Sequence, residues 1–176
     1  MMLLSGRPHN VSGTCVACTM EGTRPILAEI QALVTTSGYG TPRRMSTGYD
    51  YNRLALIIAV LEKRAGFYFS NSDTYINVVG GLRLDEPAVD LSVAMALISS
   101  LKDVPIPENT LAFGEIGLGG EIRPVANAQA RINEASRLGF TKIIIPYHNL
   151  KSVSTNTAKI NGVKNIKEAY EVMLDE

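Results

Sequence analysis

The segment from Pro87 to Leu101 constrains the fold more than any other part of this 176-residue chain. Its residues are mostly apolar or small, and a proline stands in its first turn, where the missing N–H donor is harmless. A helix without a broad polar face has to be covered on most sides. The segment therefore predicts a largely buried helix that begins at Pro87 or Ala88, with Asp85 or Glu86 favouring its N-terminus.

The remaining segments alternate between strand and helix signals. Gly22 to Pro25 and Gly117 to Gly120 read as hairpin turns, Asp50 as a helix cap, and Gly66 and Gly139 as helix stops. Predicted strands are 14–21, 26–36, 67–69, 75–79, 111–116, 121–123 and 142–145, and predicted helices are 51–64, 127–138 and 166–174. Because strands and helices alternate with hairpins and without repeats, we expect one α+β domain at 11–176, with residues 1–10 as a linker or chain end.

Composition fits a single soluble domain. Seventeen basic and seventeen acidic residues leave the chain neutral, so attraction to nucleic acid would need local clustering. The longest purely apolar run, Leu54 to Leu61, is far shorter than the roughly 20 residues that span a bilayer. We expect no membrane partner and a cytoplasmic location.

Cys15 and Cys18 form the only Cys-x-x-Cys pair. A structural zinc site needs four ligands, and the two histidines, His9 and His148, stand far apart in the chain. The surrounding residues read as a strand, in which positions three apart point to opposite faces. We therefore expect two buried or edge thiols in a reducing compartment rather than a metal site.

Two segments resemble the active-site segments of the Lon-type serine–lysine proteases. The first runs from Gly80 to Leu91, and the second runs from Gly114 to Arg131 and leads into a strand that ends at Pro146. In that family a serine follows the proline of the first segment, and a lysine stands five residues after the proline of the second. Here these positions hold Ala88 and Gln129.

These two substitutions remove the expected chemistry. A methyl group cannot attack a carbonyl, and a neutral carboxamide cannot act as a general base near pH 7. We therefore expect no catalytic residue and no peptidase activity, in a Lon-like fold of mixed sheets packed by helices. Two alternatives stay open: a pseudoprotease that holds a peptide or partner in the vacated groove, and a hydrolase with a displaced site. Candidate replacement nucleophiles are Ser92, Ser99 and Ser100, although no activating base is evident for them.

Further motifs, at residues 20–25, 28–34, 42–44, 49–53 and 86–91, make the chain similar to the C-terminal domain of the bacterial RadA (Sms) DNA-repair family. The likeness covers roughly residues 4–175, and several motifs in order are more specific than one. It implies an assembly and DNA-binding scaffold within a ring-shaped, DNA-dependent ATPase that drives branch migration in recombination.

The same resemblance implies partners that lie outside this sequence. It points to a ring of identical subunits, six in number, to DNA, and to recombinase proteins. The chain lacks a phosphate-binding loop and a four-cysteine set. ATP, magnesium and zinc are therefore expected only in N-terminal domains, and the chain is expected to be an isolated C-terminal fragment without a cofactor of its own.

The first part of the chain carries a mild basic excess, with seven Lys or Arg against four Asp or Glu in residues 1–70. Arg43 and Arg44 fall in a predicted polar loop, 37–50, where adjacent guanidiniums can reach phosphates. The alternative is a solvated pair or an intersubunit salt bridge. Arg53, Lys63 and Arg64 are weaker DNA-binding candidates, since a position on a helix also explains them.

Two further charges have structural interpretations. Lys102 is most simply a favourable charge at a helix C-terminus. Asp90 and Arg131 are hypothesised to pair across the former active site, replacing a catalytic cleft by an ion pair.

Overall fold

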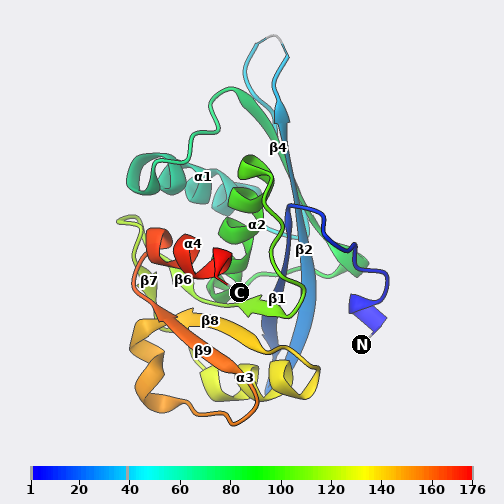
Figure 1. Cartoon of the computed structure of the whole chain (residues 1–176). Coiled ribbons are helices and arrows are strands. Elements are labelled where there is room, and N and C mark those ends of the chain that lie inside the picture. Colours follow the sequence, from blue (N-terminus) through cyan, green and yellow to red (C-terminus); the bar gives the residue numbers. More distant parts are fainter. Residues whose placement is uncertain (1, 39, 176) are drawn as a thin grey trace.

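A seven-stranded mixed sheet forms the centre of the computed structural model, which describes residues 2–38 and 40–175 (Figure 1). Met1, Tyr39 and Glu176, which fall in the predicted linker, loop and domain end, lie outside the described residues. The strand order is β3-β4-β2-β1-β5-β8-β9. Their bounds are β1 (Thr14–Glu21), β2 (Arg24–Thr36), β3 (Arg44–Thr47), β4 (Ser72–Val78), β5 (Thr110–Ala112), β8 (Lys142–Pro146) and β9 (Lys159–Val163).

The sheet joins an antiparallel part to a parallel part. β1 with β2 and β2 with β4 are antiparallel, whereas β3–β4, β1–β5, β5–β8 and β8–β9 are parallel. A separate two-stranded sheet pairs β6 (Glu115–Ile116) with β7 (Ile122–Arg123). The α+β class with mixed sheets, hairpins and helices is confirmed.

Helices cover both faces of the sheet. The helices are α1 (Tyr51–Ala65), α2 (Asp90–Lys102), α3 (Ala128–Arg137) and α4 (Ile166–Leu174). One core contains side chains of α1, α2 and α4, and a second core, on the other face, contains side chains of α3. Strand alternation separates the two: in β1, Cys15 and Ala17 enter the first core, while Val16 and Cys18 enter the second.

The predicted buried helix is α2, in which ten of thirteen residues are buried. Figure 1 places α2 between the sheet and the helices α1 and α4. Pro87 opens the 3-10 turn η3 (Pro87–Val89) that leads into it, as its fixed φ and missing N–H favour. This helix is the element around which the first core is built.

Local signals define both ends of α1. The Asp50 carboxylate accepts a hydrogen bond from the backbone N–H of Arg53, which confirms the predicted N-cap. Gly66 ends the helix in the left-handed conformation, at φ 74°.

Two predicted strands were wrong in detail. Residues 67–69 form a loop and no strand. Phe67 and Phe69 are buried and Tyr68 is 68% exposed, so the loop has the same alternation of buried and exposed side chains as a strand. The predicted strand 111–116 is divided between β5 and β6, in different sheets. Gly114 separates them, because its N–H donates to the Ala88 carbonyl and its carbonyl accepts from Leu91.

Part of the predicted loop 37–50 is the strand β3, which pairs in parallel with β4 at the sheet edge. The prediction of an unbroken loop was therefore wrong. Flanking Gly and Pro residues hide a strand of only four residues from pattern analysis. Arg44, its first residue, is half-buried and pairs in register with Thr74.

Residues 2–10, predicted as a linker, lie against the domain. They include a short 3-10 turn, η1 (Met2–Leu4), and Leu4 packs against the second core. Arg7 donates to the Glu108 carbonyl at 3.2 Å, and His9 contacts the Glu108 carboxylate. Across 2–38 and 40–175, no helix combines the length and apolar character needed to cross a membrane.

Candidate functional site

Ala88 lies in η3, immediately before α2, and is buried. Its carbonyl accepts a hydrogen bond from Gly114 N–H at 2.8 Å. The position that would carry a nucleophile in the Lon-type pattern therefore presents only a methyl group, and its backbone ties η3 to the segment that leads into β6.

Gln129 is the second residue of α3, and its carboxamide binds the backbone of Ser154. The side-chain oxygen accepts from Ser154 N–H at 2.9 Å, and the side-chain nitrogen donates to the Ser154 carbonyl at 2.8 Å. A carboxamide makes both bonds because it carries both an acceptor and donors, whereas a lysine ammonium only donates. Gln129 thus fastens α3 to the segment that follows η4 (Tyr147–Ser152).

Glu86 and Arg131 form a partly buried ion pair close to Ala88. Arg131 is 1% exposed, and its guanidinium donates to both oxygens of Glu86, to the Cys18 carbonyl at 2.7 Å and to the Ala126 carbonyl at 3.0 Å. Glu86 also accepts from Met20 N–H at 3.1 Å. β1 pairs with β5 only where Val16 lies opposite Leu111. The ion pair therefore binds backbone groups of β1, at Cys18 and Met20, that lie past this pairing.

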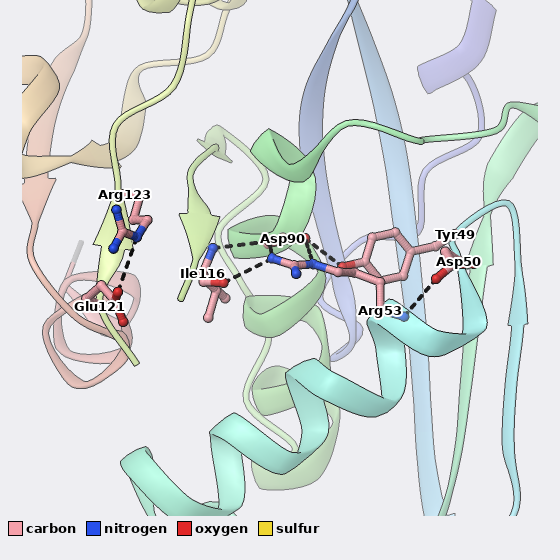
Figure 2. A network of polar contacts seen from close by, with 7 residues as sticks. All are labelled: Tyr49, Asp50, Arg53, Asp90, Ile116, Glu121 and Arg123. Carbon is pink, nitrogen blue, oxygen red and sulfur yellow. Dashed lines mark hydrogen bonds and ion pairs between the residues drawn. The ribbon is translucent and has the colours of Figure 1, made fainter. Parts of the chain in front are cut away.

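A second polar network surrounds Asp90, the fully buried first residue of α2 (Figure 2). Its carboxylate accepts from Tyr49 Oη at 2.7 Å, from Arg53 Nε at 3.1 Å and from Ile116 N–H at 3.1 Å, and it also contacts Arg53 Nη2. Arg53 Nη2 donates in addition to the Ile116 carbonyl at 3.0 Å. This network joins α1, α2 and β6.

The network fixes the protonation of its members. The hydrogen bond to Asp90 raises the pKa of Arg53, and burial, followed by the Asp90 charge, raises the pKa of the Tyr49 hydroxyl. Arg53 therefore stays a cation and Tyr49 stays neutral near pH 7. Neither group is available as a general base.

The hypothesised pair between Asp90 and Arg131 was wrong. Asp90 pairs with Arg53, and Arg131 pairs with Glu86. Because Asp90 points toward α1 and β6, whereas Arg131 points to the end of β1, each charge is satisfied by a different neighbour. Glu86 and Tyr49 were not predicted as members of the site, although each lies in a motif, 86–91 and 49–53, that carries the family resemblance.

Two open hollows flank the segment from Leu82 to Glu86. One, of about 300 Å³, borders the Asp90 network, and the other, of about 380 Å³, borders the end of β1. The first is lined by Tyr49, Asp50, Arg53, Arg83, Leu84, Asp85, Glu86, Pro87 and Asp90. Arg83 and Asp85, which line both hollows, form an exposed ion pair with 3.0 Å between Nε and Oδ1.

The candidate serines are engaged in structural hydrogen bonds. Ser92 is buried, and its hydroxyl donates to the Ala112 carbonyl. Ser99 accepts from Gly13 N–H at 2.9 Å and donates to the Val104 carbonyl. Ser100 accepts from Val34 N–H at 2.9 Å.

The arginines of the predicted DNA-binding loop differ from each other. Arg43 is exposed, and its backbone N–H donates to the Asp73 carboxylate at 2.8 Å. Arg44 donates to the Phe69 carbonyl at 2.9 Å and to the Ser72 carbonyl, so its guanidinium ties β3 to the loop before β4.

The other candidate cations lie along helices. Arg53 belongs to the Asp90 network, while Lys63 and Arg64 are exposed in the last turn of α1. Arg64 Nε donates to the Leu118 carbonyl at 3.2 Å. Lys102 lies in the last turn of α2, with its ammonium 5.7 Å from the Phe67 ring centre.

Cys15 and Cys18 are free buried thiols that enter opposite cores, as the strand pattern predicts. Burial is the main cause that raises the pKa of each thiol, to about 12. Facing opposite sides of β1, they cannot share a ligand. Within 2–38 and 40–175 there is no group of three or more His, Cys, Asp or Glu residues suited to a metal ion.

Comparison with known proteins gives one family match and a group of relatives. The family model described as subunit ChlI of Mg-chelatase matches residues 52–149. DNA repair protein RadA of Halalkalibacterium halodurans is 46% identical over 174 residues, 98% of this chain and 38% of the relative. The proteins of the same name from Streptococcus pneumoniae and Bacillus subtilis are 49% and 44% identical, over 97% and 98% of the chain. The chain spans 38% to 41% of the length of these three relatives.

Proposed function

We propose that this chain, which belongs to the family described as subunit ChlI of Mg-chelatase, is a non-catalytic, Lon-protease-like scaffold domain that assembles copies of a RadA-type DNA repair protein and holds DNA. The observation that carries the proposal is that both dyad positions have structural roles: Ala88 is buried in η3, and Gln129 binds the Ser154 backbone. The part played in DNA repair is supported by the names of relatives that match nearly the whole chain.

Absence of peptidase activity can be measured directly. The unaltered chain, incubated with a labelled unfolded protein, is expected to release no fragments. The double variant Ala88→Ser with Gln129→Lys is expected to give at most weak cleavage, because lysine cannot accept the Ser154 N–H and because a working dyad also needs supporting groups around it. Cleavage by the unaltered chain, lost on substitution near Ala88, would contradict the proposal.

For DNA, the proposal assigns the phosphate contact to Arg43 and a positioning role to Arg44. Arg43 is exposed on the segment that enters β3, and Arg44 is held by carbonyls of the neighbouring loop. Contacts of this kind bind phosphates without reading bases. Since the chain is neutral overall, one copy is expected to bind weakly and linked copies to gain through effective concentration.

The test is fluorescence anisotropy with single-stranded and duplex DNA across a salt series, on the assembled protein. Arg43→Ala is expected to weaken binding equally for all sequences and to reduce the salt slope by about one unit per lost contact. Arg137→Ala is the control, because Arg137 is exposed on α3 and pairs with Glu134 at 2.8 Å. An unchanged slope for Arg43→Ala would assign Arg43 to the surface or to a subunit contact. Lys63, Arg64 and Arg53 follow as weaker candidates for the same measurement.

The proposal extends to the longer protein. There the domain would close a ring of six subunits around DNA, in the cytoplasm, next to an ATPase core that carries ATP and magnesium and a separate zinc motif. Recombinase proteins would be its partners in branch migration. A closed ring is the usual outcome of a head-to-tail interface whose rotation closes.

A second candidate function is partner binding in the vacated groove, which the two hollows beside the segment from Leu82 to Glu86 favour. A peptide library screened against the chain would test it. Asp85→Arg should then abolish any binding, since Asp85 lines both hollows, while Asp175→Arg, at the far pocket beside Lys159, should not. Equal binding by both variants would argue against the groove.

A further inference from the structure

An uncharged groove lies beside the N-terminal segment, on the face of the sheet that α3 covers in part. It has a volume of about 350 Å³. None of its lining residues carries a formal charge, in a chain of which 19% of residues are charged. The groove residues are Pro8, Val11, Ser12, Thr14, Gln31, Ala32, Leu33, Tyr75 and Asn77.

The groove continues into an apolar row across three strands. Tyr75 of β4 pairs in register with Leu33 of β2 on one side and with Met45 of β3 on the other. Leu33 is 60% exposed, and Val11 and Met45 are each 54% exposed. On the same face of β2, Leu27 is buried in the core that contains α3, so α3 covers the sheet there and leaves the Leu33 end bare. Contiguous exposed apolar surface of this kind marks an interaction site.

The β6–β7 hairpin presents a single apolar side chain at its tip. Leu118 is 68% exposed, and the turn around it is held rigidly. Gly117 N–H donates to the Glu121 carbonyl at 3.0 Å, Gly120 N–H donates to the Gly117 carbonyl at 3.0 Å, and Arg64 Nε donates to the carbonyl of Leu118 itself. A turn whose backbone is already fixed loses little backbone entropy when it is held by a partner.

The charges beside the two features are complementary. Arg64 and Lys63, in the last turn of α1, lie next to the hairpin, where Glu121 and Arg123 pair with each other at 3.2 Å. At the groove, Ser12 donates to the carboxylate of the exposed residue Asp103 at 2.8 Å. Lys63 and Arg64 thus supply positive charge beside a tip whose turn also holds the Glu121 carboxylate, at Gly119 N–H. Asp103 supplies negative charge beside Ser12 of the groove, as in interfaces with an apolar core and a polar edge.

We propose that Leu118 of one copy docks into the uncharged groove of a second copy. Figure 1 shows the β6–β7 hairpin and the N-terminal segment on opposite sides of α2, so one molecule cannot bring its own tip to its own groove. Tip-to-groove contact is head-to-tail, and repeated around an axis it generates a ring. The inference rests on the assembly part of the proposed function and names the surfaces that perform it.

Light scattering and sedimentation across a concentration series test the contact. Leu118→Ser and Leu33→Thr are each expected to weaken self-association about tenfold or more, since each removes a leucine from the buried centre of the contact. Tyr68→Ser is the matched control, because Tyr68 is also 68% exposed but lies in the loop between α1 and β4. Circular dichroism of each variant establishes that its fold is retained.

Cysteine cross-linking tests the direction of the contact. A Leu118→Cys chain mixed with a Leu33→Cys chain is expected to give a covalent dimer under mild oxidation, and neither chain alone is expected to do so. The native thiols should not interfere, since both are buried. The chain that carries both substitutions is expected to form a series of longer products.

The outcomes separate the two proposals. If the unaltered chain associates but both leucine variants associate equally well, or if mixed chains do not cross-link, the tip-to-groove contact is refuted and assembly uses another surface. If the unaltered chain stays monomeric at high micromolar concentration, the assembly function fails and the contact fails with it. Weakening confined to Leu118→Ser and Leu33→Thr, together with cross-linking of mixed chains, supports both.

Discussion

Replacing Asp90 by alanine should cost the fold about 3 to 4 kcal/mol of unfolding free energy. The substitution leaves the Arg53 guanidinium, the Tyr49 hydroxyl and the Ile116 N–H without their common acceptor. Breaking a buried pair by removing one partner typically costs about 3 to 5 kcal/mol. The lower part of that range applies, because the Arg53 side chain is 28% exposed and can recover part of its hydration.

The charge and the shape of the Asp90 side chain can be separated by a second variant. Asp90→Asn keeps the size and one acceptor oxygen, but its amide nitrogen would face groups that donate to the carboxylate, so its loss should approach that of Asp90→Ala. The control is Arg123→Ala, which breaks the exposed pair with Glu121 that Figure 2 shows beside the network. Loss of that pair should cost about 0.5 kcal/mol or less, because exposed ion pairs contribute little.

Urea unfolding followed by far-ultraviolet circular dichroism measures the three variants, since the chain has no tryptophan to serve as a fluorescence probe. The midpoints should move while the slope stays constant, as expected for a change in stability alone. If Asp90→Ala lowers the unfolding free energy no more than Arg123→Ala does, the reasoning is refuted, because burial would then add nothing to the stability that the Asp90 network provides.

Three further predictions concern caps, backbone and thiols. Asp50→Ala should lower the unfolding free energy by about 1 kcal/mol in the same assay, because it removes the N-cap of α1. Gly48→Ala should cost at least about 2 kcal/mol, measured by thermal melting, since φ is +87° and a Cβ would lie 2.6 Å from the Leu82 carbonyl oxygen. Stability should fall as pH rises from 9.0 toward 12, because unfolding restores the ordinary pKa of 9.0 to thiols whose folded pKa is about 12. The contribution of each thiol is complete below pH 9.0 and is lost by about 1.4 kcal/mol per pH unit above it. The variant with Cys15→Ala and Cys18→Ala should show a correspondingly flatter alkaline decline, and an equal decline would contradict the assignment.

Much of the secondary structure could be predicted because its signals are local. The cap at Asp50 and the stop at Gly66 fix α1 through bonds within a few residues. The helix predicted over 166–174 agrees with α4, Ile166–Leu174, which follows an Asn165 side chain that accepts from Glu168 N–H. The strand β3 escaped prediction because it has no core-facing pattern of its own and depends on pairing with β4.

The polar contacts of the site could not be predicted, because they join residues far apart in sequence. Arg53 and Asp90 are separated by 37 positions, and Glu86 and Arg131 by 45. Charge type alone allows either acid to pair with either arginine. The choice depends on how the packed structure places α1, α3 and the segment from Glu86 to Asp90 relative to one another. Ala88 and Gln129 were singled out from a family resemblance, but the contacts of Gln129 with Ser154 were not predicted.

The Glu86–Arg131 pair has a consequence for solubility. A strand edge with free N–H and C=O groups is a template on which another chain can add a strand, and such edges promote aggregation. At the end of β1, the Met20 N–H and the Cys18 carbonyl are instead occupied by these two side chains. Their charged groups thus cover the part of β1 that extends past its pairing with β5. A chain that lost either one would be expected to precipitate or to form fibrils under conditions in which the intact domain stays in solution.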